Sequence, residues 1–225
     1  MLSRIQAILR SNGFRLYIQP YELNIIGVRS RSTKPNRFDD EIHVFYTTAN
    51  GKWNYHIYQA TTDPGTYWLN QPGEAQGTAI LAQGQYVDAY AIDKHQGKYY
   101  ALCQKMSPVT VIRNYDRNVV LDFMNGTSQR DMFGINIHRA NSNGTTKKVD
   151  RYSAGCQVFS NAEDFAEFMK LCERHRKRYG NKFTYTLIDS RAIFRETAKR
   201  VVIGSTFLAL MGMLAYRQRN TYADA

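Results

Sequence analysis

The sequence predicts a mainly β protein with packed helices, the α+β fold class. Three observations lead to this prediction. Aromatic residues, which favour strands, are plentiful, with 16 Tyr, 11 Phe and 2 Trp. Between residues 15 and 122, short strand-like runs alternate with turn signals. Helical periodicity is confined to a few separate segments, and 225 residues are enough for one good hydrophobic core.

The first half of the chain supplies most of the expected strands. Residues 2–9 form a short amphipathic pattern that predicts a helix, ended by the breaker Ser11-Asn12-Gly13. Turn residues such as Asp63-Pro64-Gly65 then separate runs of β-branched and aromatic residues. These runs predict strands at 23–28, 41–47, 53–60, 67–69, 99–104, 109–112 and 119–123.

Residues 133–138 predict a further strand with one polar face. Phe133, Ile135 and Ile137 alternate with other residues, so a strand here would place Asn136 and His138 together on the opposite face. A polar loop follows over 139–152. The pattern therefore brings a histidine to the end of a strand, directly before a long loop.

A helix and a last strand complete the predicted domain. Ser160 with Glu163 three residues later predicts a capping box that opens the helix. Apolar residues recur at helical core spacing along it: Phe165, Phe168, Met169 and Cys172. Gly180 ends the helix, and 183–188 predicts a strand.

The C-terminal segment differs in kind. Residues 201–216 are sixteen residues without a formal charge, bracketed by basic residues. A helix of that length spans roughly 24 Å, short of the roughly 30 Å hydrocarbon core of a bilayer. The segment predicts either a membrane anchor with snorkelling basic ends or a helix that contacts an oligomer or partner. The chain then divides into an N-terminal helical segment (1–22), a main domain (23–189) and a basic linker with the hydrophobic helix (190–225).

Thirty basic residues against 19 acidic ones give a net charge of +11. Such an excess attracts nucleic acid, an anionic membrane or an acidic cell-wall polymer. Much of it falls between Arg174 and Arg219, and no nucleic-acid motif accompanies it, so we do not expect a nucleic-acid partner. Residues 1–15 lack an apolar run of signal-peptide length, which predicts that no signal peptide is cleaved.

The number and spacing of the cysteines predict neither disulfides nor a metal site. Cys103, Cys156 and Cys172 are an odd set without Cys-x-x-Cys spacing, so neither a disulfide framework nor a structural zinc site is expected. No converging set of ligand-type side chains is visible, and we expect no metal and no cofactor. Cys103 and Cys172 lie in apolar patterns that predict burial. His95, in a turn, predicts a surface residue.

Cys156 is the candidate nucleophile. A cysteine attacks as its thiolate, which requires a proton-accepting or positive neighbour. The small residues Ala154 and Gly155 leave its sulfur approachable, and N–H groups of Gly155 and Cys156 can hold an oxyanion. His138 is the candidate base, and Ser153 would orient His138 or the substrate by hydrogen bonding.

Ser153-Ala154-Gly155-Cys156, separated from His138 by fourteen residues, resembles the signature of the L,D-transpeptidase (YkuD-type) catalytic-domain family. Residues 61–67, with Asp63-Pro64-Gly65, resemble a strand entry of that family, and the likeness extends over about 23–189. The family usually has a second His at the position of Ala154 and Arg or Asn at that of Val158, and Gln157 is a neighbouring polar substitute. These departures favour a specialised, phage-encoded branch.

The resemblance implies a β-sandwich with a C-terminal hydrophobic helix, and a reaction on peptidoglycan stem peptides. Cys156 would attack the carbonyl of the third stem residue and expel the terminal D-Ala, forming a thioester. An amine would then make a crosslink, or water would make the enzyme a carboxypeptidase or endopeptidase. Besides the catalytic Cys156, His138, Ser153 and Gly155, candidate substrate contacts are Arg139, Gln157, Tyr152 and Asn136.

A second hypothesis is non-enzymatic: a phage virion or envelope structural protein that retains this fold with a weakened or repurposed site. Ala154 in place of the second His, the basic tail and the apolar terminal segment favour it. Both hypotheses place the protein in the cell envelope or in a phage virion, with 201–216 as a candidate anchor.

Overall fold

The computed structural model describes residues 1–114, 118–123 and 126–199. The described residues form two compact units, one of residues 15–190 and one of residues 1–14 and 191–199. In the smaller unit, α1 (Leu2–Ser11) buries Ile5, Ile8 and Leu9, one helical face at i, i+3 and i+4 spacing. Residues 191–199 are also helical.

The predicted hydrophobic helix at 201–216 lies outside the described residues. Among the helices that are described, none combines the length and the apolar character needed to cross a bilayer. The predicted helix at 2–9 is confirmed by α1.

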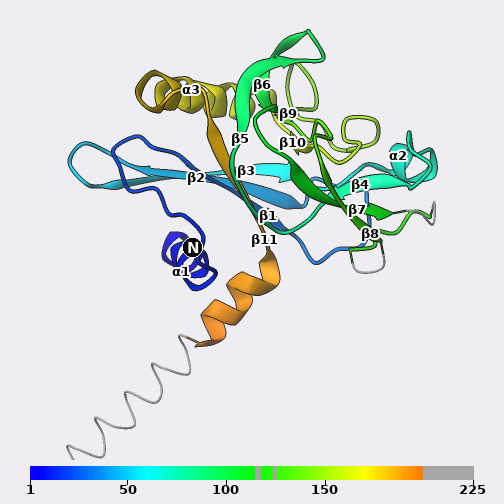
Figure 1. The fold of residues 1–225 in the computed structure, drawn as a ribbon, viewed down its shortest axis with the longest axis horizontal. Helices are drawn as coiled ribbons and strands as arrows, with labels where there is room; N and C mark the ends of the chain where they lie inside the picture. Colours follow the sequence, from blue (N-terminus) through cyan, green and yellow to red (C-terminus); the bar gives the residue numbers. More distant parts are fainter. Residues whose placement is uncertain (115–117, 124–125, 200–225) are drawn as a thin grey trace, which may run out of the picture. The chain divides into compact units, whose positions relative to one another are not determined.

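In the larger unit, eight strands close into a barrel in the order β1-β11-β5-β6-β9-β10-β3-β2 (Figure 1). The pairs β1–β11 and β9–β10 are parallel, and the others are antiparallel. The strands are β1 (Asn24–Arg29), β2 (Asp40–Thr47), β3 (Trp53–Thr61), β5 (Gly84–His95), β6 (Tyr99–Gln104), β9 (Ile137–Arg139), β10 (Gln157–Phe159) and β11 (Phe183–Asp189).

A three-stranded sheet and two helices complete this unit. The sheet has the order β4-β7-β8, with β4 (Thr78–Leu81), β7 (Val109–Asn114) and β8 (Thr127–Asp131). The helices are α2 (Thr66–Asn70) and α3 (Ala162–Tyr179). Figure 1 shows the sheet and α2 on one side of the barrel, and α3 at another.

The main core fills the barrel and the space under α3. Tyr90 and Tyr185 are fully buried and meet edge-on, with ring centroids 5.9 Å apart. From α3, Phe165 and Phe168 pack against Phe159 of β10, at centroid distances of 5.5 and 5.0 Å. Aromatic packing of this kind fixes where β10 lies, and β10 begins directly after the candidate nucleophile Cys156.

The coarse prediction of a mainly β, α+β protein is confirmed. The strands predicted at 23–28, 41–47, 53–60, 99–104, 109–112 and 183–188 correspond to β1, β2, β3, β6, β7 and β11. The sheet closes into a barrel where the family resemblance implied a sandwich, because β1 pairs with β11 as well as with β2. A closed sheet leaves no exposed edge strand.

Several local predictions were wrong. Residues 67–69 lie in the short helix α2, and 119–123 form no strand. Only the end of 133–138 is extended, as β9. The cap of α3 is Asn161, whose side chain accepts from the N–H groups of Glu163 and Asp164. Ser160 instead donates its hydroxyl to the carbonyl of Gln59. Strands β4, β5, β8 and β10 were not predicted from the sequence.

A buried charged cluster braces the segment that leads to α2. Arg29 Nε lies 2.8 Å from Oδ1 of Asp63, and both side chains are buried. Asp40, also buried, accepts hydrogen bonds from the N–H groups of Ser30 and Thr62. Two carboxylates thus share one nearby guanidinium. Burial, opposed by Arg29 and reinforced by Asp40, raises the pKa of Asp63 to about 8.

This raised pKa predicts a stability that falls as the pH rises. Between pH 4 and 8 the folded protein keeps a proton on Asp63 that the unfolded chain has lost, so folding takes up a proton and the free energy of unfolding decreases with pH. Asp63→Asn stays neutral. We expect its Tm to match the wild type near pH 4 and to exceed it at pH 8, by a few kcal/mol in free energy at most.

Thermal unfolding of both proteins from pH 4 to 8 measures the difference. Asp39→Asn is the matched control, because Asp39 is the exposed neighbour of the same cluster. A Tm difference between Asp63→Asn and wild type that does not change with pH would contradict the buried, proton-bearing state of Asp63.

Candidate active site

A tight turn holds Cys156 at the start of β10. Ser153 is fully buried, and its hydroxyl donates to the Cys156 carbonyl (2.8 Å) and accepts from the Gly155 N–H (3.1 Å). The N–H of Gly65 donates to the Ser153 carbonyl (2.9 Å), which ties the turn to the segment after β3. The hydrogen bonds of Ser153 are therefore made to the turn itself, and its position braces the nucleophile.

Gly155 allows this turn to pack against β4. Its φ is +120°, in the region that favours glycine. A side-chain carbon at this position would overlap the carbonyl oxygen of Ala79 and would touch Ile135. The backbone of the turn thus lies directly on β4, which fixes the distance of Cys156 from the three-stranded sheet.

The Cys156 thiol is free and partly exposed. Its sulfur lies 3.6 Å from the Gly134 carbonyl, to which it donates, and 3.4 Å from the Asn136 N–H, from which it accepts. Burial raises its pKa to about 11, against the opposing effect of the Asn136 N–H. The resting side chain is a thiol at neutral pH. Cys103 and Cys172 are buried, as the sequence predicted.

His138 lies on β9 and is almost fully buried. Its Nδ1 is 2.8 Å from the Arg139 carbonyl and 3.3 Å from the Tyr99 hydroxyl. A carbonyl only accepts, so Nδ1 carries the proton and Nε2 is left as a hydrogen-bond acceptor. Burial and then the neighbouring His95 lower the pKa of His138 to about 3. The imidazole is therefore neutral over the whole physiological range.

His95 is a member of the site that sequence reasoning missed. It ends β5, is buried, and stacks on His138 with ring centroids 4.1 Å apart and planes inclined by 19°. The side-chain amide of Asn136 donates to its Nδ1 at 3.0 Å. Burial and Lys98 lower the pKa of His95. Since β5 was not predicted, no sequence signal placed this histidine beside His138.

His138 lies on β9, and Cys156 directly precedes β10, the parallel neighbour of β9. The register pairs His138 with Val158, and the side chains of paired residues point the same way. Cys156 packs against the small cluster that contains Val158. Within the described residues no hydrogen bond joins Cys156 to His138. The Cys156 thiol is engaged with Gly134 and Asn136, and His138 with Arg139 and Tyr99.

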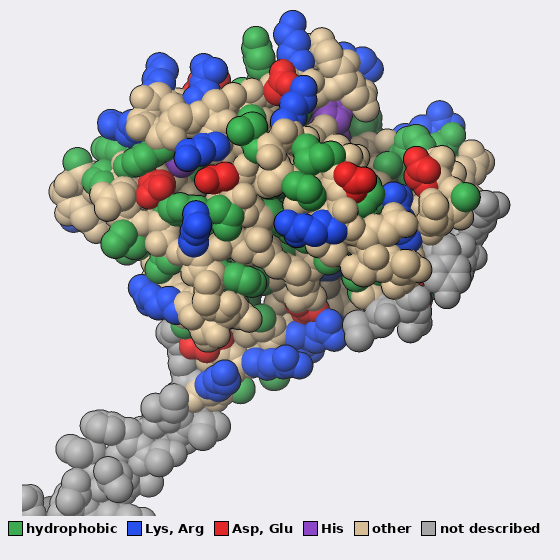
Figure 2. Space-filling model, viewed as in Figure 1, with side chains coloured by type: hydrophobic (Ala, Val, Ile, Leu, Met, Phe, Trp, Pro, Cys, Tyr) green, Lys and Arg blue, Asp and Glu red, His purple; other side chains and the backbone are tan. Residues whose placement is uncertain are grey.

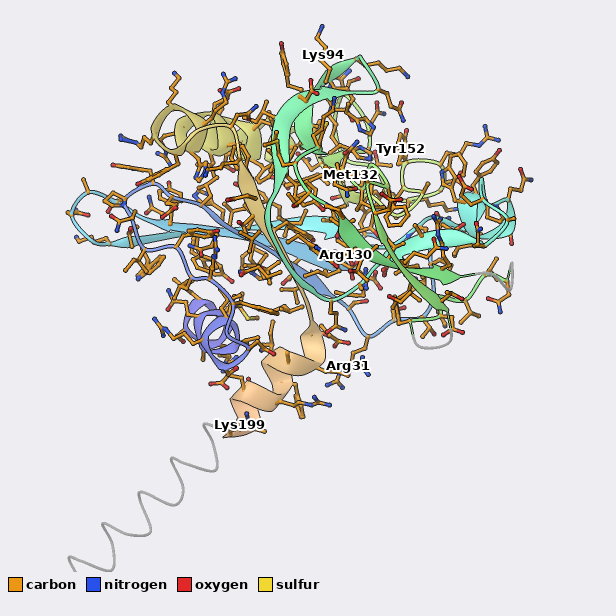
Figure 3. The ribbon with its side chains drawn as sticks, viewed as in Figure 1. Arg31, Lys94, Arg130, Met132, Tyr152 and Lys199 are labelled. Atoms are coloured by element: carbon orange, nitrogen blue, oxygen red, sulfur yellow. The ribbon has the colours of Figure 1, made fainter. Side chains whose placement is uncertain are left out.

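The four predicted substrate contacts divide into two pairs. Gln157 points into the barrel, where its amide bonds the Gly155 carbonyl (3.1 Å) and the Tyr185 hydroxyl (2.8 Å). The Asn136 side chain donates a hydrogen bond to His95 and accepts one from the Gln104 N–H. Both support the turn and the histidines. Arg139 lies over the Tyr99 ring at 4.5 Å, and Tyr152 is 40% exposed on the loop before the turn (Figure 3).

A cavity of about 320 Å³ adjoins the Cys156 turn. Ala154 and Ile135 form part of its wall, and these residues neighbour Cys156 and its acceptor Gly134. Its other lining residues include Trp68, Glu74, Arg113 and Phe133. Ala154, which precedes Gly155 and the candidate nucleophile Cys156, thus borders a space that fits a small ligand or one end of a peptide.

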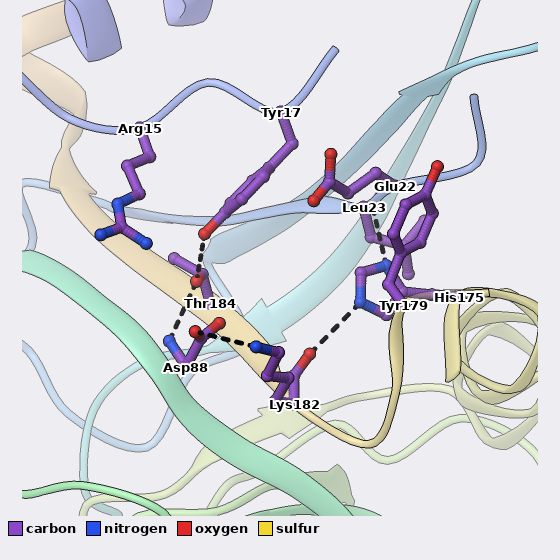
Figure 4. Close-up of a pocket in the computed structure, with 9 residues that line it drawn as sticks. All are labelled: Arg15, Tyr17, Glu22, Leu23, Asp88, His175, Tyr179, Lys182 and Thr184. Atoms are coloured by element: carbon purple, nitrogen blue, oxygen red, sulfur yellow. Dashed lines mark hydrogen bonds and ion pairs between the residues drawn. The ribbon is translucent and has the colours of Figure 1, made fainter. Parts of the chain in front are cut away.

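A second cavity, of about 300 Å³, lies between β5, β11, the end of α3 and residues 15–23 (Figure 4). Its histidine, His175, accepts from the Leu23 N–H (3.1 Å) and donates to the Lys182 carbonyl (3.2 Å). The Lys182 ammonium faces the Asp88 carboxylate at 3.9 Å. These groups bond to one another, so His175 joins α3 to the start of β11 and has a structural role.

Among the residues that the structure describes, no group of His, Cys, Asp and Glu side chains is arranged to bind a metal ion. On the face shown in Figure 2, Lys and Arg side chains are spread over many elements and do not form one patch. A comparison with known protein families, with curated proteins and with solved structures finds no match for this chain.

Proposed function

We propose that this chain is a cysteine-dependent acyl transferase or hydrolase that acts on peptidoglycan stem peptides through a thioester on Cys156. The observation that carries the proposal is a partly exposed thiol directly before β10 and a neutral imidazole on its parallel neighbour β9. The likeness of His138 and Ser153–Cys156 to L,D-transpeptidase catalytic domains supports the substrate class and a place in the cell envelope or a phage virion.

In the proposed reaction, the Cys156 thiol turns from the Gly134 carbonyl toward Nε2 of His138. The proton passes to Nε2 as sulfur bonds to the carbonyl carbon of the peptide. The C–N bond then breaks, and the leaving amine takes that proton from His138. An amine or water next attacks the thioester and gives a proton to His138, which returns it to the departing sulfur.

The pKa values of the pair support a concerted proton transfer. Burial raises the pKa of Cys156 to about 11 and lowers that of His138 to about 3, so the neutral pair is strongly favoured over a thiolate and imidazolium. The thiolate then forms only as the new bond forms. His95 stacks on His138 and fixes its ring, which makes His95 a positioning residue.

The oxyanion of the tetrahedral intermediate has a donor in the Cys156 N–H. This N–H makes no hydrogen bond to any described residue, whereas the Gly155 N–H already donates to Ser153. A fixed, unengaged donor next to the attacked carbon is the arrangement that stabilises such an intermediate. We therefore assign the oxyanion to Cys156 and not to Gly155.

A second candidate is a structural protein of a virion or envelope with an inert site. The raised pKa of Cys156 and the hydrogen bond of its thiol to the Gly134 carbonyl favour this role. In that case the wild-type protein neither turns over stem peptides nor carries an acyl group on Cys156 after incubation with them.

The proposal is tested with tetrapeptide muropeptides and mass spectrometry. The wild type is expected to release D-Ala or to form a new crosslink, and Cys156→Ala to lose about 1,000-fold or more of that rate. Cys172→Ala, which removes a buried thiol on α3, is the control and should keep the wild-type rate. Equal turnover by Cys156→Ala would remove this cysteine as the nucleophile.

A further inference from the structure

Arg113 on β7 is a buried cation that pairs with no carboxylate among the residues described by the structure. Its side chain is only 8% exposed. Nε donates to the Gln129 amide oxygen at 2.8 Å, and Nη1 donates to the Gly77 carbonyl at 3.2 Å. The guanidinium lies over the Phe133 ring, 5.0 Å from its centroid. Within the described residues no Asp or Glu lies within ion-pair distance of Arg113, and Nη2 donates to no described acceptor.

A buried charge of this kind is normally paired. Removing a cation from water costs several kcal/mol unless an anion or a full set of hydrogen bonds compensates. Arg29, the other arginine buried to this degree among the described residues, has two carboxyl groups near it, Asp40 and Asp63, and its Nε lies 2.8 Å from Asp63 Oδ1. Arg113 has two neutral acceptors and one aromatic face. Its remaining donors therefore suit an anion, and none of the described side chains supplies one.

The anion would come from the cavity beside Cys156. Arg113 lines this cavity, and so do Ala154 of the Cys156 turn and Ile135, which follows Gly134. A volume of about 320 Å³ is small for a ligand site and holds the end of a peptide better than an internal stretch. The exposed Glu74 also lines the cavity, and its carboxylate would repel a ligand with several negative charges. A single carboxylate at a chain end fits these features.

We propose that Arg113 binds the terminal carboxylate of the peptide that Cys156 attacks, through the donors at Nη2 and the edge of the guanidinium. This assignment rests on the proposed function for the identity of the peptide, but the binding step is independent of catalysis. In this role Arg113 determines specificity. A peptide whose terminal carboxylate lies close to the attacked carbonyl is bound, whereas a longer peptide, or one whose terminal carboxylate is amidated, is not.

The test measures binding to the full-length Cys156→Ala protein, in which no turnover occurs. Two probes are compared by calorimetry: the disaccharide tetrapeptide with a free terminal carboxylate, and the same muropeptide with that carboxylate amidated. We expect the acid to bind about 10- to 100-fold more tightly than the amide. Adding Arg113→Gln, which keeps donors for Gln129 and Gly77, should abolish the difference, and Arg113→Lys should retain part of it.

A spectroscopic readout covers the case in which Arg113→Gln does not fold. In 15N-labelled Cys156→Ala protein, the Arg113 Nε–H resonance should shift on titration with the acid and not with the amide. Equal affinity for the two probes, or an unmoved Arg113 resonance at saturation, would overturn the assignment. Turnover by wild type together with equal affinities would remove only the role of Arg113. A selective, Arg113-dependent affinity without turnover would remove only the acyl-transfer reaction.

Discussion

His138→Gln is expected to lower turnover at pH 7 by about 100- to 10,000-fold, the usual contribution of a general base. The structure gives the physical reason. His138 is neutral, with its proton on Nδ1 held by the Arg139 carbonyl, so Nε2 can take the thiol proton. Without that base, attack requires a thiolate that already exists, and the pKa of Cys156 is raised to about 11.

The pH profile separates this mechanism from an ion-pair mechanism. The wild-type rate should be nearly flat from about pH 4 to 10, because both side chains stay neutral between a pKa of about 3 and one of about 11. The rate of His138→Gln should rise about tenfold per pH unit toward pH 11 as thiolate forms. Measuring kcat/KM from pH 5 to 10 shows both.

His56→Gln is the matched control, since His56 lies on β3 and contacts Glu167 of α3. Its profile should equal that of the wild type. A flat profile in His138→Gln, or a bell-shaped one in the wild type, would contradict the role given to His138.

Gly155→Ala should destabilise the protein by about 3 kcal/mol, the sum of backbone strain and overpacking. At φ +120° a side chain is strained, and here it would also overlap the Ala79 carbonyl. For a chain of this size, that corresponds to a Tm lower by about 6–12 °C. The turn that carries Cys156 would have to move away from β4, so turnover should fall as well.

Gly144→Ala isolates the strain from the overlap. Gly144 also has a positive φ, +61°, but nothing lies within 4 Å of where its side chain would be. We expect it to cost about 1 kcal/mol and to leave turnover intact. Equal Tm losses in the two variants, measured by thermal unfolding, would show that the turn does not pack on β4 as described.

Much of the barrel could be predicted because local pattern and fold agree. The predicted 99–104 coincides with β6, and 183–188 lies within β11. In α2 the tertiary structure overrides local preference: aromatic Tyr67 and Trp68 predict a strand, but Gly65 is tied to Ser153 and the chain turns into a helix. In β5 the alternation of inward and outward side chains is broken at Asp88, which has φ +50°. The register of β5 with β11 shifts at the same place, so a regular strand pattern is missing from the sequence.

The candidate site could be predicted only in part for a similar reason. Cys156 and His138 were proposed together because one motif contains both, and the parallel pair β9–β10 brings their segments next to each other. Gln157 was predicted to contact substrate, but its inward position on β10 buries it against Tyr185. His95 and Arg113 come from strands distant in sequence, and only the closed barrel and the second sheet bring them to the site.

The central claim is that Cys156 carries the acyl group. The most direct measurement is the mass of the intact protein, followed by peptide mapping, after rapid quenching of a reaction with tetrapeptide muropeptide. We expect an adduct equal to the muropeptide without its terminal D-Ala, located on the peptide that contains Cys156 and removed by hydroxylamine. An adduct on Cys103 or Cys172, or turnover with an adduct that persists in Cys156→Ala, would contradict it.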